Sequence, residues 1–188
     1  MKRIDFRRKR EGKTDYRRRL RLLMSNKLRL IVRLSLKNIV VQFAEYDEKG
    51  DKILVGASSS ELNKKFGWNA GRNNLPASYL TGYLAGKKAA KKGLKEAVLD
   101  IGLMDSIGGG KIYAALKGVL DAGLNIPCSE EVLPDENSVK GMHIVEYPKK
   151  LLKEDKDKYN KLFSSYIKKG IKPEDLAKYF DDTKKKIG

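Results

Sequence analysis

The chain contains very little cysteine, histidine or tryptophan. Of its 188 residues only Cys128 is a cysteine and only His143 is a histidine. One cysteine excludes an intrachain disulfide and a metal site built from several thiolates. Neither Cys128 nor His143 belongs to a catalytic group of residues by its spacing, so we interpret both as structural.

The glycine-rich turn before Lys111 is not a phosphate-binding loop. These glycines precede an expected helix, but Ile112 stands where such a loop has a hydroxyl residue. We therefore expect neither a metal nor a cofactor.

Long apolar runs are also missing. No stretch approaches the ~18 consecutive apolar residues that a membrane span requires. The first residues lack the apolar core of a signal peptide as well. We therefore expect a cytoplasmic protein from a reducing compartment, with no membrane partner.

Acidic residues are too few to balance the basic ones. The chain has 41 lysines and arginines against 24 aspartates and glutamates, so its formal net charge is +17. Such an excess attracts polyanions and is typical of proteins that bind nucleic acid. The length suits one main domain of ordinary size with extensions.

Carboxylates are especially scarce where a nuclease needs them. Metal-dependent cleavage of a phosphodiester requires several carboxylates around two divalent ions. The first expected strand carries none, Asp100 stands alone in a later strand, and Asp47, Glu48 and Asp51 lie in a turn. We expect no catalytic residues, so the chain is not interpreted as an enzyme.

What the chain does have is a dense basic segment near its start. Nine of the eighteen residues from Phe6 to Leu23 are arginine or lysine, so we interpret residues 1–26 as an arm without a core of its own. Asp15 to Met24 suits a helix, with Thr14 or Asp15 as its cap. Its arginines would lie along a phosphate backbone while its leucines touch the body.

Strict alternation begins after Lys27. Leu28, Leu30, Val32, Leu34 and Leu36 share one face of an expected strand, whose other face is basic. The basic face holds Arg29, Ile31, Arg33, Ser35 and Lys37. Arg29 and Arg33 are either ordinary solubilising charges or a continuation of the arm's basic surface onto a rigid sheet.

The rest of residues 27–127 completes an α/β body. Strands over Ile39–Tyr46 and Ile53–Ala57 continue an antiparallel meander. A helix is expected over Ala77–Leu94, with Pro76 in its first turn and Asn73 or Asn74 as its cap. A strand over Ala97–Leu103, a helix from Lys111 and a short strand over Leu124–Ile126 follow. Three meandering strands followed by helix, strand and helix are typical of a ribonuclease H-like layout, which keeps a nuclease as an alternative.

Residues 128–188 form a linker and a helical extension. Cys128 to Gly141 is polar and acidic and is interpreted as the linker. Aromatic and aliphatic residues at helical spacing predict one helix up to Gly170 and a second from Pro173.

Four stretches together resemble one known family. They are Arg8–Tyr16 (RKREGKTDY), Leu30–Arg33, Ala77–Leu84 and Ala115–Pro127 (ALKGVLDAGLNIP). The chain resembles the eighteenth large-subunit ribosomal protein family in its archaeal and eukaryotic form, over nearly its whole length. It departs from the family pattern at Asn74–Ala77, where members commonly show Thr-Asn-Tyr-Ala, and at Cys128, which is often histidine.

The resemblance implies a structural constituent of the large ribosomal subunit. It implies a three-layer α/β/α body with a mixed sheet, and an arm that follows RNA. The implied partners are 5S ribosomal RNA, 23S-type ribosomal RNA and the other 5S-binding protein of the subunit, all in the central protuberance. A generic RNA-binding or chaperone protein is the alternative. The expected RNA contacts are Arg7, Arg8, Lys9, Arg10, Lys13, Tyr16, Arg17, Arg18, Arg19, Arg21, Lys27, Arg29 and Arg33, with Tyr16 as a stacking platform.

Overall fold

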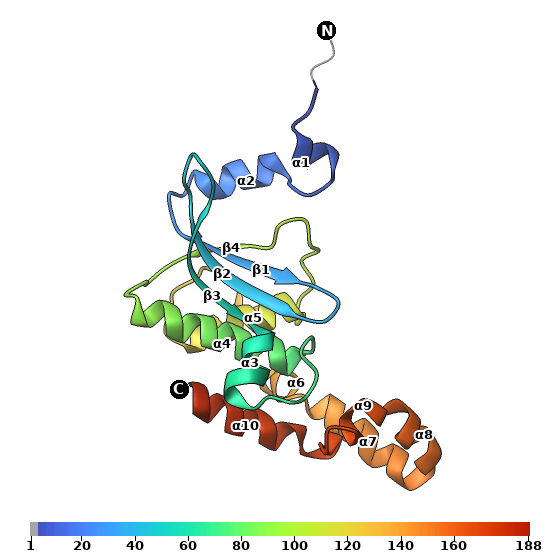
Figure 1. Cartoon of the computed structure of the whole chain (residues 1–188). Coiled ribbons are helices and arrows are strands. Elements are labelled where there is room, and N and C mark those ends of the chain that lie inside the picture. The colour runs from blue at the N-terminus through green and yellow to red at the C-terminus, as the bar shows by residue number, and fades with distance from the viewer. Residues whose placement is uncertain (1–3) are drawn as a thin grey trace.

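A mixed four-stranded sheet lies at the centre of the protein (Figure 1). The structure is a computed structural model and describes residues 4–188. The strands are β1 (Arg29–Leu34), β2 (Ile39–Glu45), β3 (Lys52–Ser58) and β4 (Val98–Asp100), in the spatial order β3-β2-β1-β4. The first three run antiparallel, and β4 returns parallel to β1. The predicted meander and the α/β class are confirmed.

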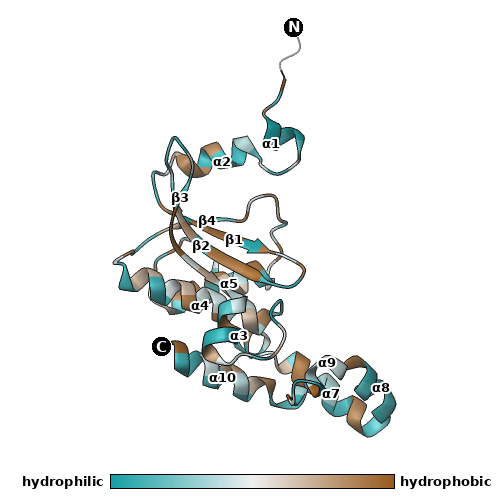
Figure 2. Cartoon of the chain, in the orientation of Figure 1, coloured by the Kyte–Doolittle hydropathy of each residue, from teal (hydrophilic) through white to brown (hydrophobic). Residues whose placement is uncertain are grey.

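Two long helices cover one face of the sheet. They are α4 (Leu75–Lys91) and α5 (Lys111–Asp121), and α3 (Ser59–Phe66) joins the meander to α4. The side chain of Asn74 accepts a hydrogen bond from the Ala77 amide, and Pro76 lies in the first turn of α4, as the sequence predicts. Figure 2 shows the strands as largely apolar, and Leu30, Val32 and Phe43 are buried in the core against these helices.

The opposite face of the sheet lies beneath the basic arm. The arm forms α1 (Arg7–Arg10) and α2 (Tyr16–Leu23), and α2 runs above the sheet on the side away from α4 and α5 (Figure 1). Asp15 caps α2, because its carboxylate accepts from the amides of Arg17 and Arg18. Helices on both sides of the sheet give the three layers.

The C-terminal residues are more helical than their sequence suggests. They form α6 (Glu136–Lys140), α7 (Met142–Glu154), α8 (Lys156–Leu162), α9 (Ser164–Ile167) and α10 (Leu176–Ile187), with 3-10 turns at Glu130–Val132 and Pro173–Asp175. Within 128–141, which the sequence predicts to be a linker, residues Glu136–Lys140 form α6. Helix α10 packs on α3 and α4 and so returns the end of the chain to the body.

Three strand predictions need correction at their ends. The first strand stops at Leu34, and Leu36 is 96% exposed in a turn where the Ser35 side chain bonds the backbone of Asn38. The strand expected over 97–103 ends at Asp100. The strand expected over 124–126 is reduced to a single bridge between Glu96 and Asn125.

Two lysines at the C-terminal end of α4, Lys88 within the helix and Lys92 directly after it, lie against the outer edge of the sheet. Lys88 donates to the Gly56 carbonyl at 3.0 Å and Lys92 donates to the Leu54 carbonyl at 2.6 Å, and both carbonyls belong to the edge strand β3. Lys88 also meets Glu61 at 2.7 Å. Among residues 4–188, no helix is both long and apolar enough to cross a lipid bilayer.

Candidate nucleic-acid interface

A tight joint divides the basic arm into two parts. Gly12 has a φ of +61°, in the left-handed region that favours glycine, so the chain turns sharply after α1. The turn is fixed by the Arg8 guanidinium, whose Nε donates to the Thr14 hydroxyl at 2.9 Å. This joint lies in the EGKTD segment between the two arginine clusters.

Four of the predicted contact residues are exposed and have no side-chain partner within residues 4–188. They are Arg10, Arg17, Arg21 and Arg33. Three belong to the arm and the last lies near the end of β1. Guanidinium groups free of protein acceptors are the groups that bind phosphate oxygens most readily, so these four are the strongest candidates for direct contacts.

Four further cations are held only by exposed ion pairs. These pairs are Arg7 with Glu11 at 3.7 Å, Lys9 with Asp5 at 2.7 Å, Lys13 with Glu11 at 2.9 Å and Lys27 with Glu96 at 2.6 Å. Exposed pairs of this kind contribute roughly 0–1 kcal/mol, so a phosphate group exchanges with the carboxylate at little cost. The four cations remain available to a polyanion.

Tyr16 packs against another aromatic ring of the arm. Its ring centroid lies 5.2 Å from that of Phe6, with the two planes tilted by 48°. This contact joins α2 to the segment before α1 across the joint at Gly12. A stacking role for Tyr16 on RNA bases stays a prediction.

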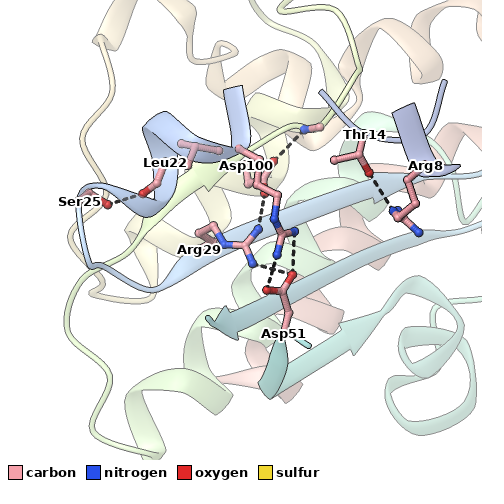
Figure 3. A network of polar contacts seen from close by, with 9 residues as sticks. Arg8, Thr14, Leu22, Ser25, Arg29, Asp51 and Asp100 are labelled. Carbon is pink, nitrogen blue, oxygen red and sulfur yellow. Dashed lines mark hydrogen bonds and ion pairs between the residues drawn. The ribbon is translucent and has the colours of Figure 1, made fainter. Parts of the chain in front are cut away.

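Three predicted contact residues are bound by acceptors of the protein itself. Arg19 makes two bonds to the Asp51 carboxylate, at 3.0 and 2.8 Å, and Arg29 reaches the same carboxylate at 2.7 Å (Figure 3). Arg29 also bonds Asp100 at 2.9 Å, and Arg18 donates to the Gly102 carbonyl at 2.8 Å. The prediction that Arg29 lies on an exposed basic face is wrong, because its side chain is buried beneath α2 and only 1% of Arg29 is exposed.

The local charges stabilise this arrangement. Partial burial of Asp51 opposes its ionisation, but hydrogen bonds and attraction from Arg19 and Arg29 outweigh that effect and hold its pKa below the ordinary value. The hydrogen bond to Asp51 raises the pKa of Arg19. Both groups are therefore fully charged near neutral pH.

A cleft of about 320 Å³ lies between the arm and the sheet. Arg8, Lys13 and Arg33 line its basic rim, and Ile31 and Leu103 belong to its apolar lining. The cleft brings residues of the arm, of β1 and of the loop after β4 to one place. The basic surface is thus continuous from the arm to the end of β1.

The sequence did not reveal the acidic partners Asp51 and Asp100. Asp51 directly precedes β3, and Asp100 pairs with Ile31 in the register of β1 and β4. One signal was present: Ile31 shares the basic face with Arg29, and an apolar residue there indicates a covered face. No group of three or more His, Cys, Asp or Glu side chains within the described residues is arranged to hold a metal ion.

Comparison with known proteins gives a consistent result. A family model described as ribosomal large subunit proteins 60S L5 and 50S L18 matches residues 2–96, which include the meander, α3, the whole of α4 and all but the first residue of the arm. The large ribosomal subunit protein uL18 of Methanococcus maripaludis is 51% identical over 185 residues, covering 98% of this chain and 95% of the relative. The likeness therefore extends through the C-terminal helices.

Proposed function

The chain belongs to the family of ribosomal large-subunit proteins 60S L5 and 50S L18, and from this premise we propose that it binds 5S ribosomal RNA in the central protuberance. As a member it is a structural constituent of the large ribosomal subunit and acts in the ribosome with ribosomal RNA as its partner. The family is structural, so the nuclease alternative is set aside.

The observation that carries the proposal is a set of arginines on a helical arm whose side chains have no partner in the described part of the chain. Arg10, Arg17 and Arg21 are exposed, and Arg33 extends the same basic surface at the cleft. Cations of this kind neutralise backbone phosphates and release counterions, which supplies affinity without reading sequence. Shape then selects the RNA, because the arm and the sheet present their charges at fixed relative positions.

The same proposal includes two further partners. We infer contacts with 23S-type ribosomal RNA and with the other 5S-binding protein of the subunit, so that the chain anchors 5S RNA to the body of the subunit. The formal charge of +17 supports contact with more than one RNA segment. The C-terminal helices offer exposed side chains such as Tyr147 and Leu162 for protein contacts.

Competition binding tests the proposal directly. Labelled 5S ribosomal RNA is bound to the full chain and displaced with unlabelled 5S RNA, with an unrelated structured RNA of equal length, or with a DNA duplex of equal length. We expect 5S RNA to displace the label at the lowest concentration. Equal displacement by all three would instead favour the generic RNA-binding or chaperone alternative.

A further inference from the structure

We propose that Arg29, Asp51 and Asp100 are positioning residues that dock the RNA-binding arm on the sheet before RNA arrives. Arg19 then serves as the arm's attachment point and not as a phosphate ligand. This inference rests on the proposed binding of 5S RNA through the arm, and it assigns a role to Asp51 and Asp100 in a predominantly basic interface.

The polar contacts form one continuous chain from α2 to the sheet and back to α2. Arg19 bonds both oxygens of Asp51, and Arg29 lies between Asp51 and Asp100 (Figure 3). The other oxygen of Asp100 accepts from the Gly102 amide at 3.0 Å, and the Gly102 carbonyl accepts from Arg18. We call these six residues the Arg29 network. Two neighbouring arginines of α2 are thus tied, through different routes, to one buried guanidinium.

Apolar packing alone does not explain how α2 is held. No residue of α2 is fully buried, and Leu22 and Leu23 are only half-buried. Leu20 is 62% exposed, so the expectation that the leucines touch the body fails at that position. An isolated helix of eight residues is unstable in water. Within the described residues, the Arg29 network therefore supplies the polar attachment of α2 to the body.

Burial makes this attachment stronger than an ordinary surface pair. Arg29 is almost fully buried, and neither its Nε nor its Nη2 makes a well-aligned hydrogen bond within the described residues. Nη2 meets Asp51 as an ion pair at 2.7 Å, so the charge of Arg29 depends on the two carboxylates. Removing one partner from a buried pair leaves an uncompensated charge, which is strongly unfavourable. Asp51 is shared by Arg19 and Arg29, so it is the point at which the arm and the sheet are coupled.

Docking determines which arginines meet the RNA. Arg19 binds Asp51 and Arg18 binds the loop after β4, while Arg17 and Arg21 remain exposed with no side-chain partner among residues 4–188. A docked arm presents these charges together with Arg33 in a fixed arrangement. RNA then binds without first ordering the arm, and the apparent affinity rises with the docked fraction.

The test uses a variant for which positioning and simple charge attraction predict opposite changes in RNA affinity. Asp51→Asn removes one negative charge and releases Arg19, so a purely electrostatic interface would bind RNA more tightly. Docking predicts weaker binding, by about tenfold if the docked fraction falls to about one tenth. The matched control is Glu48→Gln, which removes the same charge from the same β2–β3 turn at an exposed residue with no side-chain partner within residues 4–188. RNA binding by Glu48→Gln should be no weaker than that of the wild-type protein.

Amide hydrogen exchange in the full chain provides a readout that does not depend on RNA. We expect residues 16–23 to exchange faster in Asp51→Asn and to keep wild-type protection in Glu48→Gln. Wild-type protection in Asp51→Asn, or RNA binding as tight as that of Glu48→Gln, would overturn the inference. If wild-type protein shows no preference for 5S RNA, the proposed function fails while the exchange data still decide whether the arm is docked.

A second pair of variants tests the inference even if Asp51→Asn does not fold. Arg19→Gln leaves Arg29 with both of its carboxylates, so the sheet stays intact while α2 is released. Arg17→Gln removes the same charge from an exposed neighbour. Faster exchange of residues 16–23 in Arg19→Gln, with wild-type exchange in Arg17→Gln, is expected, and equal exchange in the two variants would contradict docking through Arg19.

Discussion

A Cβ atom placed on Gly118 would lie 2.2 Å from the carbonyl oxygen of Tyr79, so helices α4 and α5 touch backbone to backbone at this point. Gly82 faces α5 in the same way, with its Cβ position 1.9 Å from the Ala115 carbonyl oxygen. This crossing accounts for one glycine of the ALKGVLDAGLNIP segment in physical terms.

Gly118→Ala should destabilise the fold although alanine favours helices. The added methyl group forces the two helices apart, and overpacking of this kind costs roughly 1–3 kcal/mol. Urea denaturation followed by circular dichroism measures the change. Gly108→Ala is the control, because the new atom would lie 4.0 Å from the Cα of Val132, in ordinary contact. An equal loss of stability in both variants would refute the close-contact explanation.

Tyr79 joins the C-terminal helix to the body through its hydroxyl group. It donates to Asp121 at 2.5 Å and accepts from Lys184 of α10 at 2.6 Å, and burial followed by the bond to Asp121 raises its pKa, so the phenol stays protonated. Tyr79→Phe should lower the unfolding free energy by about 1–2 kcal/mol. Thermal denaturation checks this, and the half-exposed Tyr147→Phe should leave stability unchanged.

Salt dependence should separate contact arginines from other charges. The double variant Arg17→Gln and Arg21→Gln should reduce the slope of log binding constant against log salt by about 1.5, because each phosphate contact contributes ~0.7–0.9. The control changes Lys149 and Lys150 of α7, which are exposed and far from the arm (Figure 1). Filter binding of 5S RNA at several salt concentrations gives the slopes, and a similar fall in the control would indicate diffuse attraction.

Acid should release the arm only at low pH. Because the pKa of Asp51 is lower in the folded protein than in the unfolded chain, its stabilising contribution is complete above the ordinary value of ~3.9 and is lost as pH falls through the folded value. Titration of the Asp51 carboxyl by nuclear magnetic resonance should give a midpoint below ~3.9. Arg19→Ala should raise that midpoint, and an unchanged midpoint would mean that Arg19 does not hold the carboxylate.

Local signals predicted the elements that depend on neighbouring residues. Asn74 and Pro76 start α4 because a side-chain cap and a fixed φ act within one turn. Asp15 caps α2 for the same reason. The alternation in β1 separated its two faces correctly, since Leu30 and Val32 are buried on the side of α4 and α5.

Features that depend on distant residues were not predictable in the same way. The alternation of apolar and basic residues along β1 identifies a basic face, but it does not reveal that residues 16–23 cover that face. The sequence therefore predicted an exposed Arg29. Helix α7 contains Pro148, which normally interrupts a helix, yet it packs on α10 and on the turn at Pro173. Leu124 and Ile126 are buried as a strand would be, although only Asn125 pairs with a neighbour.

The bonds from Lys88 and Lys92 to β3 protect the edge of the sheet in the protein that has not yet bound RNA. An edge strand with free carbonyl groups is a template on which a second chain can add its own strand, and lysines are a common defence against such growth. Here the carbonyls of Leu54 and Gly56 are already engaged by ammonium groups. The edge strand of a protein free of RNA therefore offers fewer free carbonyl groups and carries positive charge, and both disfavour aggregation through strand addition.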